Sequence, residues 1–388
     1  MYPQRNPKQE FVSAFNFPAH GMVKAPGRVC VLGEHADYNH GFVIPFGLDL
    51  TTVVTFRVRK DSYVRVRSLE YPDYEDLFDI SREVTPCNQS WANYVRGVFY
   101  ITRDYGFDLK RGLDLLISST LPQDAGLASS GSMSAAIAGT IRKVFNLPLD
   151  KRSLALIAEK AENDFFGRQC GIMDPLTAVF AKDGYLLMID CENFNIEQIP
   201  FPEGWAVIIF HSHARKELVG SEFNDLRKTC EEAVSIMNVK SLRHASLDTL
   251  NKFINDMNKT AYHRAYHIIT ENERTQRLAQ AFMTSDLKLA CRLMSESHES
   301  LKRNFGNTIP EIDALVGFCQ QELKDKIGAR MTGGGFGGSV IALCEDKYAH
   351  QVIKNVSSKY FERFGINMFT HVCRPSEGIR IAWNKGPI

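Results

Sequence analysis

A segment of small residues, TLPQDAGLASSGS (120–132), joins an apolar run to a run of helix-forming residues. The preceding run, LDLLISS (113–119), has the pattern of a strand, and the following run, MSAAIAGTIRKVF (133–145), favours a helix. Glycine and serine let the backbone approach an anion, and the unpaired amides of a first helical turn attract negative charge. No lysine follows the last glycine, unlike in the Walker motif. The segment predicts a loop that holds a nucleoside triphosphate, with an ordinary strand–turn–helix cap as the alternative.

A second cluster, APGRVCVLGEHADYNHG (25–41), places an arginine, a glutamate, a histidine and an aspartate within a short, glycine-bounded stretch. Carboxylates accept hydrogen bonds from the hydroxyl groups of a polyol, and each such charged bond contributes about 1.5–3 kcal/mol. The cluster therefore predicts a sugar-binding loop. A polar surface turn is the alternative.

Two further segments carry chemistry. In AENDFFGRQCGIMDP (161–175), Asp174 follows an apolar approach, and an ionised aspartate beside Arg28 would orient a sugar hydroxyl or take its proton. Glu162 would hold magnesium, which prefers carboxylate and phosphate oxygens; a helix-end glutamate and a turn aspartate are the alternative reading. The glycine-rich MTGGGFGGSV (331–340) predicts a close backbone approach to a ligand, or a tight turn before a buried strand.

Strands and helices that would position these segments are mixed without strict alternation, which favours α+β layers. Strand patterns occur at 21–67, 113–119, 184–190, 205–212, 329–343 and 368–378. Helical patterns occur at 90–105 with Ser90 as N-cap, 133–145, 150–167 ended by Gly167, 216–237, 263–280, 285–303, 309–325 and 346–364. FPEG (201–204) is the candidate domain boundary.

The overall composition narrows the class of protein. A chain of 388 residues, 44% hydrophobic and 23% charged, fits two globular domains. A net charge of +1 predicts no general affinity for nucleic acid or anionic membranes, and no apolar run approaches the ~20 residues of a membrane helix. The polar first residues do not read as a signal peptide, and nine cysteines without a CxxC pair indicate reduced thiols. These features predict a cytoplasmic protein.

Taken together, the motifs carry a family resemblance. PGRVCVLGEHADYNHG, PQDAGLASSGS, CGIMD and MTGGGFGG stand in the order of the GHMP small-molecule kinases, and within these the chain resembles the galactokinase family from about residue 23 to about residue 378. The resemblance implies a ribosomal-S5-like N-terminal domain (1–200) and a ferredoxin-like C-terminal domain (201–388), with the active site in the cleft. It also implies a monomer that uses ATP and Mg²⁺ to phosphorylate galactose at its C1 hydroxyl.

The resemblance also assigns roles to individual residues. Arg28 and Asp174 match a catalytic pair, in which Asp174 faces the C1 hydroxyl and Arg28 steadies the transferring phosphoryl group. The sugar ligands that it implies are Glu34, His35, Asp37, Gly171, Asp174 and Phe223. The nucleotide contacts that it implies are Trp91 for adenine and Gly126, Leu127, Ser129, Ser130, Gly131 and Ser132 for the phosphates, with Ser130 and Glu162 at magnesium. Gly334 and Gly335 match the third motif.

The chain departs from the family pattern at five positions. The departures are Cys30 for Asn, Ala128 for Ser, Gly131 for Ala, Pro175 for Gln and Phe223 for Tyr. Pro175 and Phe223 would bear on which sugar is used, so a 1-kinase for N-acetylgalactosamine, galactosamine or arabinose is an alternative. A non-catalytic regulator that senses galactose and ATP is another alternative. CGIMD favours galactose over N-acetylgalactosamine, and the presence of Arg28 and Asp174 favours catalysis.

Overall fold

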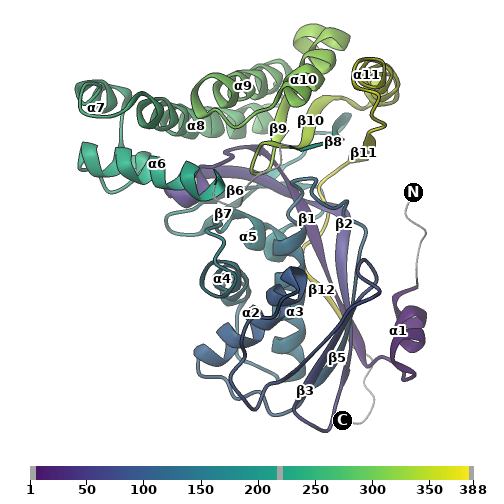
Figure 1. The fold of residues 1–388 in the computed structure, drawn as a ribbon. Coiled ribbons are helices and arrows are strands. Elements are labelled where there is room, and N and C mark those ends of the chain that lie inside the picture. The colour runs from purple at the N-terminus through teal and green to yellow at the C-terminus, as the bar shows by residue number, and fades with distance from the viewer. Residues whose placement is uncertain (1–5, 216–221, 384–388) are drawn as a thin grey trace.

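The computed structural model describes residues 6–215 and 222–383, which form two β-sheets and the helices packed on them (Figure 1). The strands of the larger sheet are β1 (Gly21–Leu32), β2 (Phe42–Val58), β3 (Tyr63–Ser68), β4 (Glu75–Asp79), β5 (Leu113–Ser119), β6 (Tyr185–Asp190), β7 (Asn195–Pro200) and β12 (Arg380–Trp383). The main order is β12-β1-β2-β5-β3-β4, and β6 joins the far part of β2 and carries β7. All pairs are antiparallel except β3 with β5.

β1 and β2 are the longest strands of this sheet and pair with each other. Their register shifts twice, between Pro26 and Arg28 and between Cys30 and Leu32. A bulge of this kind bends a strand and turns its side chains to a new direction. Here the first shift falls beside Arg28, and the second falls immediately before the GEH segment (33–35). The irregularity therefore lies where the sequence predicts chemistry.

Helices cover one face of the larger sheet. They are α2 (Ser90–Asp104), α3 (Ser129–Val144), α4 (Lys151–Lys160) with its π-helical extension η2 (Ala161–Phe165), and α5 (Met173–Phe180). α3 packs on β1 and β2, and α5 packs on β1 (Figure 1). On the opposite face lies α1 (Pro7–Phe15), which buries Phe11 and Phe15 against Leu116. The phosphate loop is thus the link from β5 to α3.

The smaller sheet has the antiparallel order β11-β8-β10-β9. Its strands are β8 (Trp205–Arg215), β9 (Gly328–Thr332), β10 (Gly337–Glu345) and β11 (Phe369–Cys373). The helices beside it are α6 (Glu222–Met237), α7 (Leu247–Lys252), α8 (Lys259–Met283), α9 (Leu287–Ser300), α10 (Pro310–Leu323) and α11 (Ala349–Phe364). A π-helical turn, η4 (Leu301–Phe305), extends α9.

A shared core joins the two sheets. Val29, Val31 and Phe46 of the larger sheet pack with Ile209 and Ile341 of the smaller one, and all five are fully buried. Each sheet also has a separate core with its own helices. Burying this much apolar surface between the sheets stabilises one arrangement of the sugar loop against the glycine-rich third motif.

Most predicted elements are present, with differences at their ends. α3 begins at Ser129 rather than residue 133, so the predicted phosphate loop includes the first helical turn. The N-cap of α2 is Gln89 and not Ser90, and no side chain caps that end. The sequence patterns did not predict α5, α7, β4, β7 or β12, and the predicted helix start at 216–221 lies outside the described residues.

The predicted boundary at 201–204 falls between β7 and β8, where the chain passes from the larger sheet to the smaller one. The last strand runs against this division, because β12 returns to pair with β1. The domain limits 1–200 and 201–388 remain a prediction.

Candidate active site

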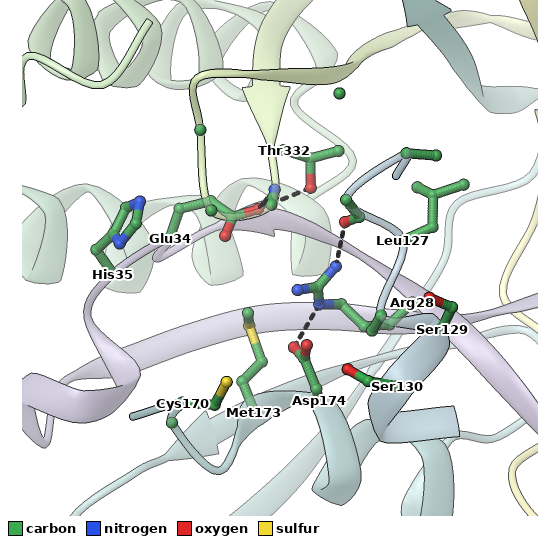
Figure 2. A pocket seen from close by; sticks show the side chains of 18 of the residues that line it. Arg28, Glu34, His35, Leu127, Ser129, Ser130, Cys170, Met173, Asp174 and Thr332 are labelled. Atoms are coloured by element: carbon green, nitrogen blue, oxygen red, sulfur yellow. Dashed lines mark hydrogen bonds and ion pairs between the residues drawn. The ribbon is translucent and has the colours of Figure 1, made fainter. Parts of the chain in front are cut away.

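Four segments distant in the sequence surround one pocket (Figure 2). They are the sugar loop (28–38), the phosphate loop (124–130), the segment before α5 (168–174) and the third motif (332–338). The structure therefore brings together all four motifs that the sequence singles out. The pocket lies where the larger sheet meets β9 and β10.

Arg28 and Asp174, 146 residues apart, meet at the floor of this pocket. The Arg28 Nε donates to Asp174 Oδ1 at 2.7 Å, and Nη1 donates to the Gly126 carbonyl at 2.6 Å (Figure 2). The Arg28 side chain is 7% exposed and that of Asp174 is 28% exposed. The predicted proximity of the two groups is confirmed. A buried guanidinium thus fixes a carboxylate that still faces the pocket.

The phosphate loop is built mainly from backbone. Ala128 adopts a left-handed conformation, with φ of 59°, and α3 starts immediately after it. The first amides of a helix have no acceptor within the helix, so those of the first turn are available to an anion. Gly126, Leu127, Ser129 and Ser130 line the pocket, as predicted.

Ser130 and Glu162, the predicted magnesium ligands, are hydrogen-bonded to each other. Ser130 Oγ donates to Glu162 Oε2 at 3.1 Å, and Cys170 Sγ lies 3.6 Å from the same oxygen. Burial raises the pKa of Glu162 to about 7; the positive charge of Arg168 opposes this rise and Asp174 adds to it. A carboxylate and a hydroxyl are oxygen donors that suit Mg²⁺. Across residues 6–215 and 222–383, no group of three or more acidic, histidine or cysteine side chains is arranged for a metal.

Asp37 opens a short 3-10 turn in the sugar loop and packs against Gly171. A Cβ atom on residue 171 would lie 2.0 Å from Asp37 Oδ2, so only glycine allows this approach. Burial raises the pKa of Asp37 to about 7, and the charge of Asp174 adds to the rise. A carboxyl group with a pKa near 7 is partly protonated at neutral pH, and its protonated form offers a sugar hydroxyl a donor as well as acceptors.

Glu34 is held by the third motif. Its Oε1 accepts from Thr332 Oγ1 at 2.7 Å and from the Gly333 amide at 2.5 Å. Glu34 is 3% exposed and lines the pocket. Gly334 and Gly335 line the same wall, and at Gly335 a side chain would collide with Asn307.

His35 is fixed on both ring nitrogens. Nδ1 lies 2.9 Å from the Tyr38 hydroxyl, Nε2 lies 2.8 Å from Asn307 Nδ2, and the ring stacks on Phe305 at 4.5 Å. Burial lowers the pKa of His35 to about 3, and His267 and Arg330 contribute to the lowering. His35 is therefore a neutral imidazole in the pocket wall at physiological pH.

Behind the sugar loop lies a second layer of buried charge. Glu271 Oε1 accepts from the Gly33 amide at 3.1 Å and from Ser297 Oγ at 2.7 Å, and Oε2 pairs with Arg274 Nε at 2.8 Å. Arg330, fully buried, donates to the Cys30 carbonyl at 3.0 Å. α8 and β9 thus hold the sugar loop from behind.

Several predicted residues lie elsewhere. Ser132 is a correction: it is fully buried, its hydroxyl donates to Ala25 O at 2.9 Å, and its amide donates to Ala128 O, so it makes no phosphate contact. Gly131 lies behind the pocket, where a Cβ atom would be 2.9 Å from Asp174 Cβ. The side chain of Phe223 is outside the described part of the structure.

Trp91 does not line the pocket. It is 7% exposed, and its ring stacks on Tyr71 at 5.7 Å and meets Tyr74 edge-on. One face of the indole is therefore already covered by a tyrosine. The role of Trp91 with adenine stays a prediction.

The pocket is also lined by residues that the sequence motifs do not single out, among them Tyr38, Asp124, Arg168 and Thr332. Thr332 stands directly before the glycine run, so its position in the third motif was a usable signal. Nothing in the charge pattern marks Arg168, which lines the pocket only because of the fold of the loop before Gly171.

Comparison with known protein families agrees with this geometry. The model of the GHMP kinases N terminal domain matches residues 93–182, and that of the GHMP kinases C terminal domain matches residues 278–362. The galactokinase galactose-binding signature matches residues 9–58. The signature covers the sugar loop, and the N-terminal model covers the phosphate loop and Asp174.

Solved structures give the same picture. Lactococcus lactis galactokinase, solved with galactose, is 29% identical with a TM-score of 0.92, over 96% of this chain and 98% of that one. Methanococcus jannaschii mevalonate kinase (19% identity, TM-score 0.67, 92% and 99% covered) and Streptococcus pneumoniae phosphomevalonate kinase (16% identity, TM-score 0.63, 90% and 99% covered) share the fold. The chain belongs to the GHMP kinase superfamily and, within it, to the galactokinase family.

Proposed function

We propose that this protein transfers the terminal phosphoryl group of ATP to the C1 hydroxyl of galactose, which yields galactose 1-phosphate and ADP. The observation that carries the proposal is the Arg28–Asp174 pair at the junction of the sugar loop and the phosphate loop. The galactose bound to the Lactococcus lactis relative supports this choice of sugar.

The sugar is bound by groups of the first and third motifs. Glu34, already anchored by Thr332, and Asp37 offer carboxyl oxygens to sugar hydroxyls. The Gly171 backbone lies against Asp37 and gives the sugar a close approach on that side. Because these groups are held before the sugar arrives, little ordering is needed on binding.

The donor's phosphates are bound at the N-terminus of α3. Phosphoryl transfer depends mainly on positioning and on stabilising charge, which backbone amides and an arginine supply. Arg28 is bonded to the Gly126 carbonyl in the phosphate loop and to Asp174, so it ties donor and acceptor sides together. This link sets the distance between the reacting groups.

Asp174 receives the proton. As the C1 oxygen bonds to phosphorus and the bond from phosphorus to the ADP oxygen breaks, the hydroxyl proton passes to the carboxylate oxygen that Arg28 leaves exposed to the pocket. Magnesium, held by Glu162 and Ser130 when bound, would neutralise charge on the donor's phosphates. The hydrogen bond between Ser130 and Glu162 supports this role, because it brings a hydroxyl oxygen and a carboxylate oxygen together.

The experiment that tests the proposal is a sugar panel. Wild-type protein with MgATP is offered galactose, N-acetylgalactosamine, galactosamine and arabinose, and ADP release is followed by a coupled assay. We expect galactose to turn over fastest, with the phosphate on C1 by NMR. Faster turnover of another sugar would replace galactose, and binding of galactose and ATP without product would identify a sensing regulator instead.

We also propose a monomeric, cytoplasmic protein without nucleic-acid or membrane partners. All nine cysteines are free, as expected for a reducing compartment. Over the described ranges, no helix combines the length and apolarity needed to cross a bilayer.

A further inference from the structure

The pocket is short of positive charge for the donor that it must hold. Of the residues that line it within the described ranges, Arg28 and Arg168 are the arginines, and no lysine is among them. Four acidic side chains line the same pocket: Glu34, Asp37, Asp124 and Asp174. A nucleoside triphosphate brings several further negative charges, and kinases offset these with cations placed along the phosphates.

Part of the charge and hydrogen-bonding capacity of Arg28 is already used within the protein. Its Nε is bonded to Asp174, its Nη1 to Gly126 O, and its side chain is 7% exposed. It neutralises the acceptor-side carboxylate before any nucleotide binds. Besides the proposed magnesium, a second arginine in the pocket would therefore stabilise the donor's phosphate chain.

Arg168 is an exposed residue of the pocket wall, on the loop between η2 and Gly171. Its amide donates to the Glu162 carbonyl at 3.0 Å, and its own carbonyl accepts from the Cys170 amide at 2.8 Å. The Asn163 side chain bonds both backbone groups of Cys170, at 2.7 and 3.1 Å. These backbone bonds fix the base of the arginine beside the Glu162–Ser130 pair.

The side chain of Arg168 is supported as well. It hydrogen-bonds the Tyr94 side chain, and the Tyr94 ring stacks on Phe166 at 4.5 Å with 19° between the planes. A guanidinium has five donors in a planar fork, so one bond to a tyrosine leaves others for a phosphate oxygen. Arg168 thus lines the same pocket as the first turn of α3, with donors to spare.

We propose that Arg168 binds the phosphate chain of the nucleotide donor, in the pocket that the first turn of α3 also lines. The proposal rests on the proposed function, because it takes a nucleoside triphosphate as the ligand of this pocket. It makes Arg168 a nucleotide-binding residue, separate from the Arg28–Asp174 pair and from the predicted magnesium ligands.

Affinities of ATP and of adenosine, measured by isothermal titration calorimetry, test this. The variants are Arg168→Met, which removes the charge at similar length, and Arg168→Lys, which keeps the charge but loses the fork. Arg111→Met, at an exposed arginine away from the pocket, is the matched control. Each protein is measured with Mg²⁺ and with the metal chelated, and circular dichroism checks its folding.

We expect Arg168→Met to weaken ATP at least about tenfold, the size of one charge-assisted hydrogen bond, with and without metal. Adenosine affinity should stay within about twofold, since adenosine carries no phosphate. Arg168→Lys should fall between Arg168→Met and wild type, and Arg111→Met should match wild type.

Two results would overturn the proposal. Unchanged ATP affinity in a folded Arg168→Met protein would remove Arg168 from nucleotide binding. Equal losses for ATP and adenosine would show that Arg168 only shapes the pocket through Tyr94. A failure of the proposed function would give a different result. Wild-type protein that binds no ATP would overturn both proposals. Wild-type protein that phosphorylates galactose, together with unchanged ATP affinity in Arg168→Met, would overturn this proposal alone.

Discussion

The wall behind the sugar loop and the pocket in front of it both contain buried carboxyl groups, and they treat them in opposite ways. Behind the loop, burial alone would raise the pKa of Glu271, but Arg274, with help from Arg330, outweighs it and lowers the pKa to about 2. In the pocket, burial raises the pKa of both Asp37 and Glu162 to about 7. The two regions differ in how many hydrogen-bonding and positively charged partners the protein gives each carboxyl group.

Glu271 has its partners within the protein: an arginine, a serine and the Gly33 amide. The pocket carboxyls have fewer such bonds and stand near other acidic groups. The first kind of group stabilises the fold, whereas the second kind costs stability that a ligand offsets on binding. Neutralising a carboxyl group behind the loop should therefore lower the free energy of unfolding, whereas neutralising one in the pocket should raise it.

The largest effect is expected at the pocket floor. Asp174→Asn removes the proton acceptor but keeps the size of the side chain, so turnover should fall by about 10³-fold or more. Galactose affinity should stay within about tenfold, because an amide oxygen still accepts a hydrogen bond. Steady-state kinetics and calorimetry check the two halves separately. Wild-type turnover in the variant would remove Asp174 from the catalytic role.

Behind the wall, Glu271→Gln should lower the free energy of unfolding by about 3 kcal/mol at pH 7, since Arg274 and Arg330 lose their buried counter-charge. Urea denaturation measures this. The folded pKa of about 2 lies below the model value of 4.5. The contribution of Glu271 is therefore complete above pH 4.5 and is lost as the pH falls towards 2.

The difference in the free energy of unfolding between wild type and Glu271→Gln should consequently decrease as the pH falls from 4.5 to 3. A gap that is constant with pH would mean that packing, and not charge, explains the loss. Burial also lowers the pKa of His35 and of His267 to about 3, so both proteins should lose stability as the pH falls from 6.5. Glu271 raises the pKa of both histidines, so that loss is common to the two proteins only above pH 3, and the comparison is made there.

How far the sequence predicts the molecule also differs between the two regions. The motifs locate the pocket floor, because Arg28 and Asp174 each stand in a recognisable segment. They do not reveal the wall, since Glu271 sits within an ordinary polar helix pattern and only its burial distinguishes it. Ser132 differs from its predicted position for a related reason: α3 begins at Ser129, which turns Ser132 towards β1.

In the pocket, Asp37→Asn should change stability in the other direction. The pKa of Asp37 in the folded protein is about 7, above the model value of 3.8. Ionisation of Asp37 therefore does not destabilise the protein below pH 3.8, and it destabilises the protein fully above pH 7. The free energy of unfolding of Asp37→Asn should exceed that of wild type by about 1–2 kcal/mol at pH 8 and by little at pH 4. Its KM for galactose should rise about tenfold.

Asp108→Asn is the matched control for this gain, because Asp108 is 73% exposed and should change neither quantity. Thermal unfolding at the two pH values and galactose kinetics decide the matter. A variant that is less stable than wild type at pH 8 would show that Asp37 already has sufficient partners within the protein.

The smallest expected effect concerns two departures from the family pattern that meet behind Asp174. A Cβ atom on Gly131 would lie 2.9 Å from Asp174 Cβ and 3.5 Å from Pro175 N. Gly131→Ala, which restores the family residue, should add up to about 1 kcal/mol of helix stability but lower kcat about three- to tenfold by displacing the carboxylate.

Pro175 stiffens the first turn of α5, so Gly131→Ala with Pro175→Gln should recover most of kcat, because the turn can then shift by a few tenths of an ångström. Kinetics of the two single variants and the double variant measure the coupling; strictly additive effects would mean that the two departures arose independently, and that the strain at Asp174 comes from elsewhere.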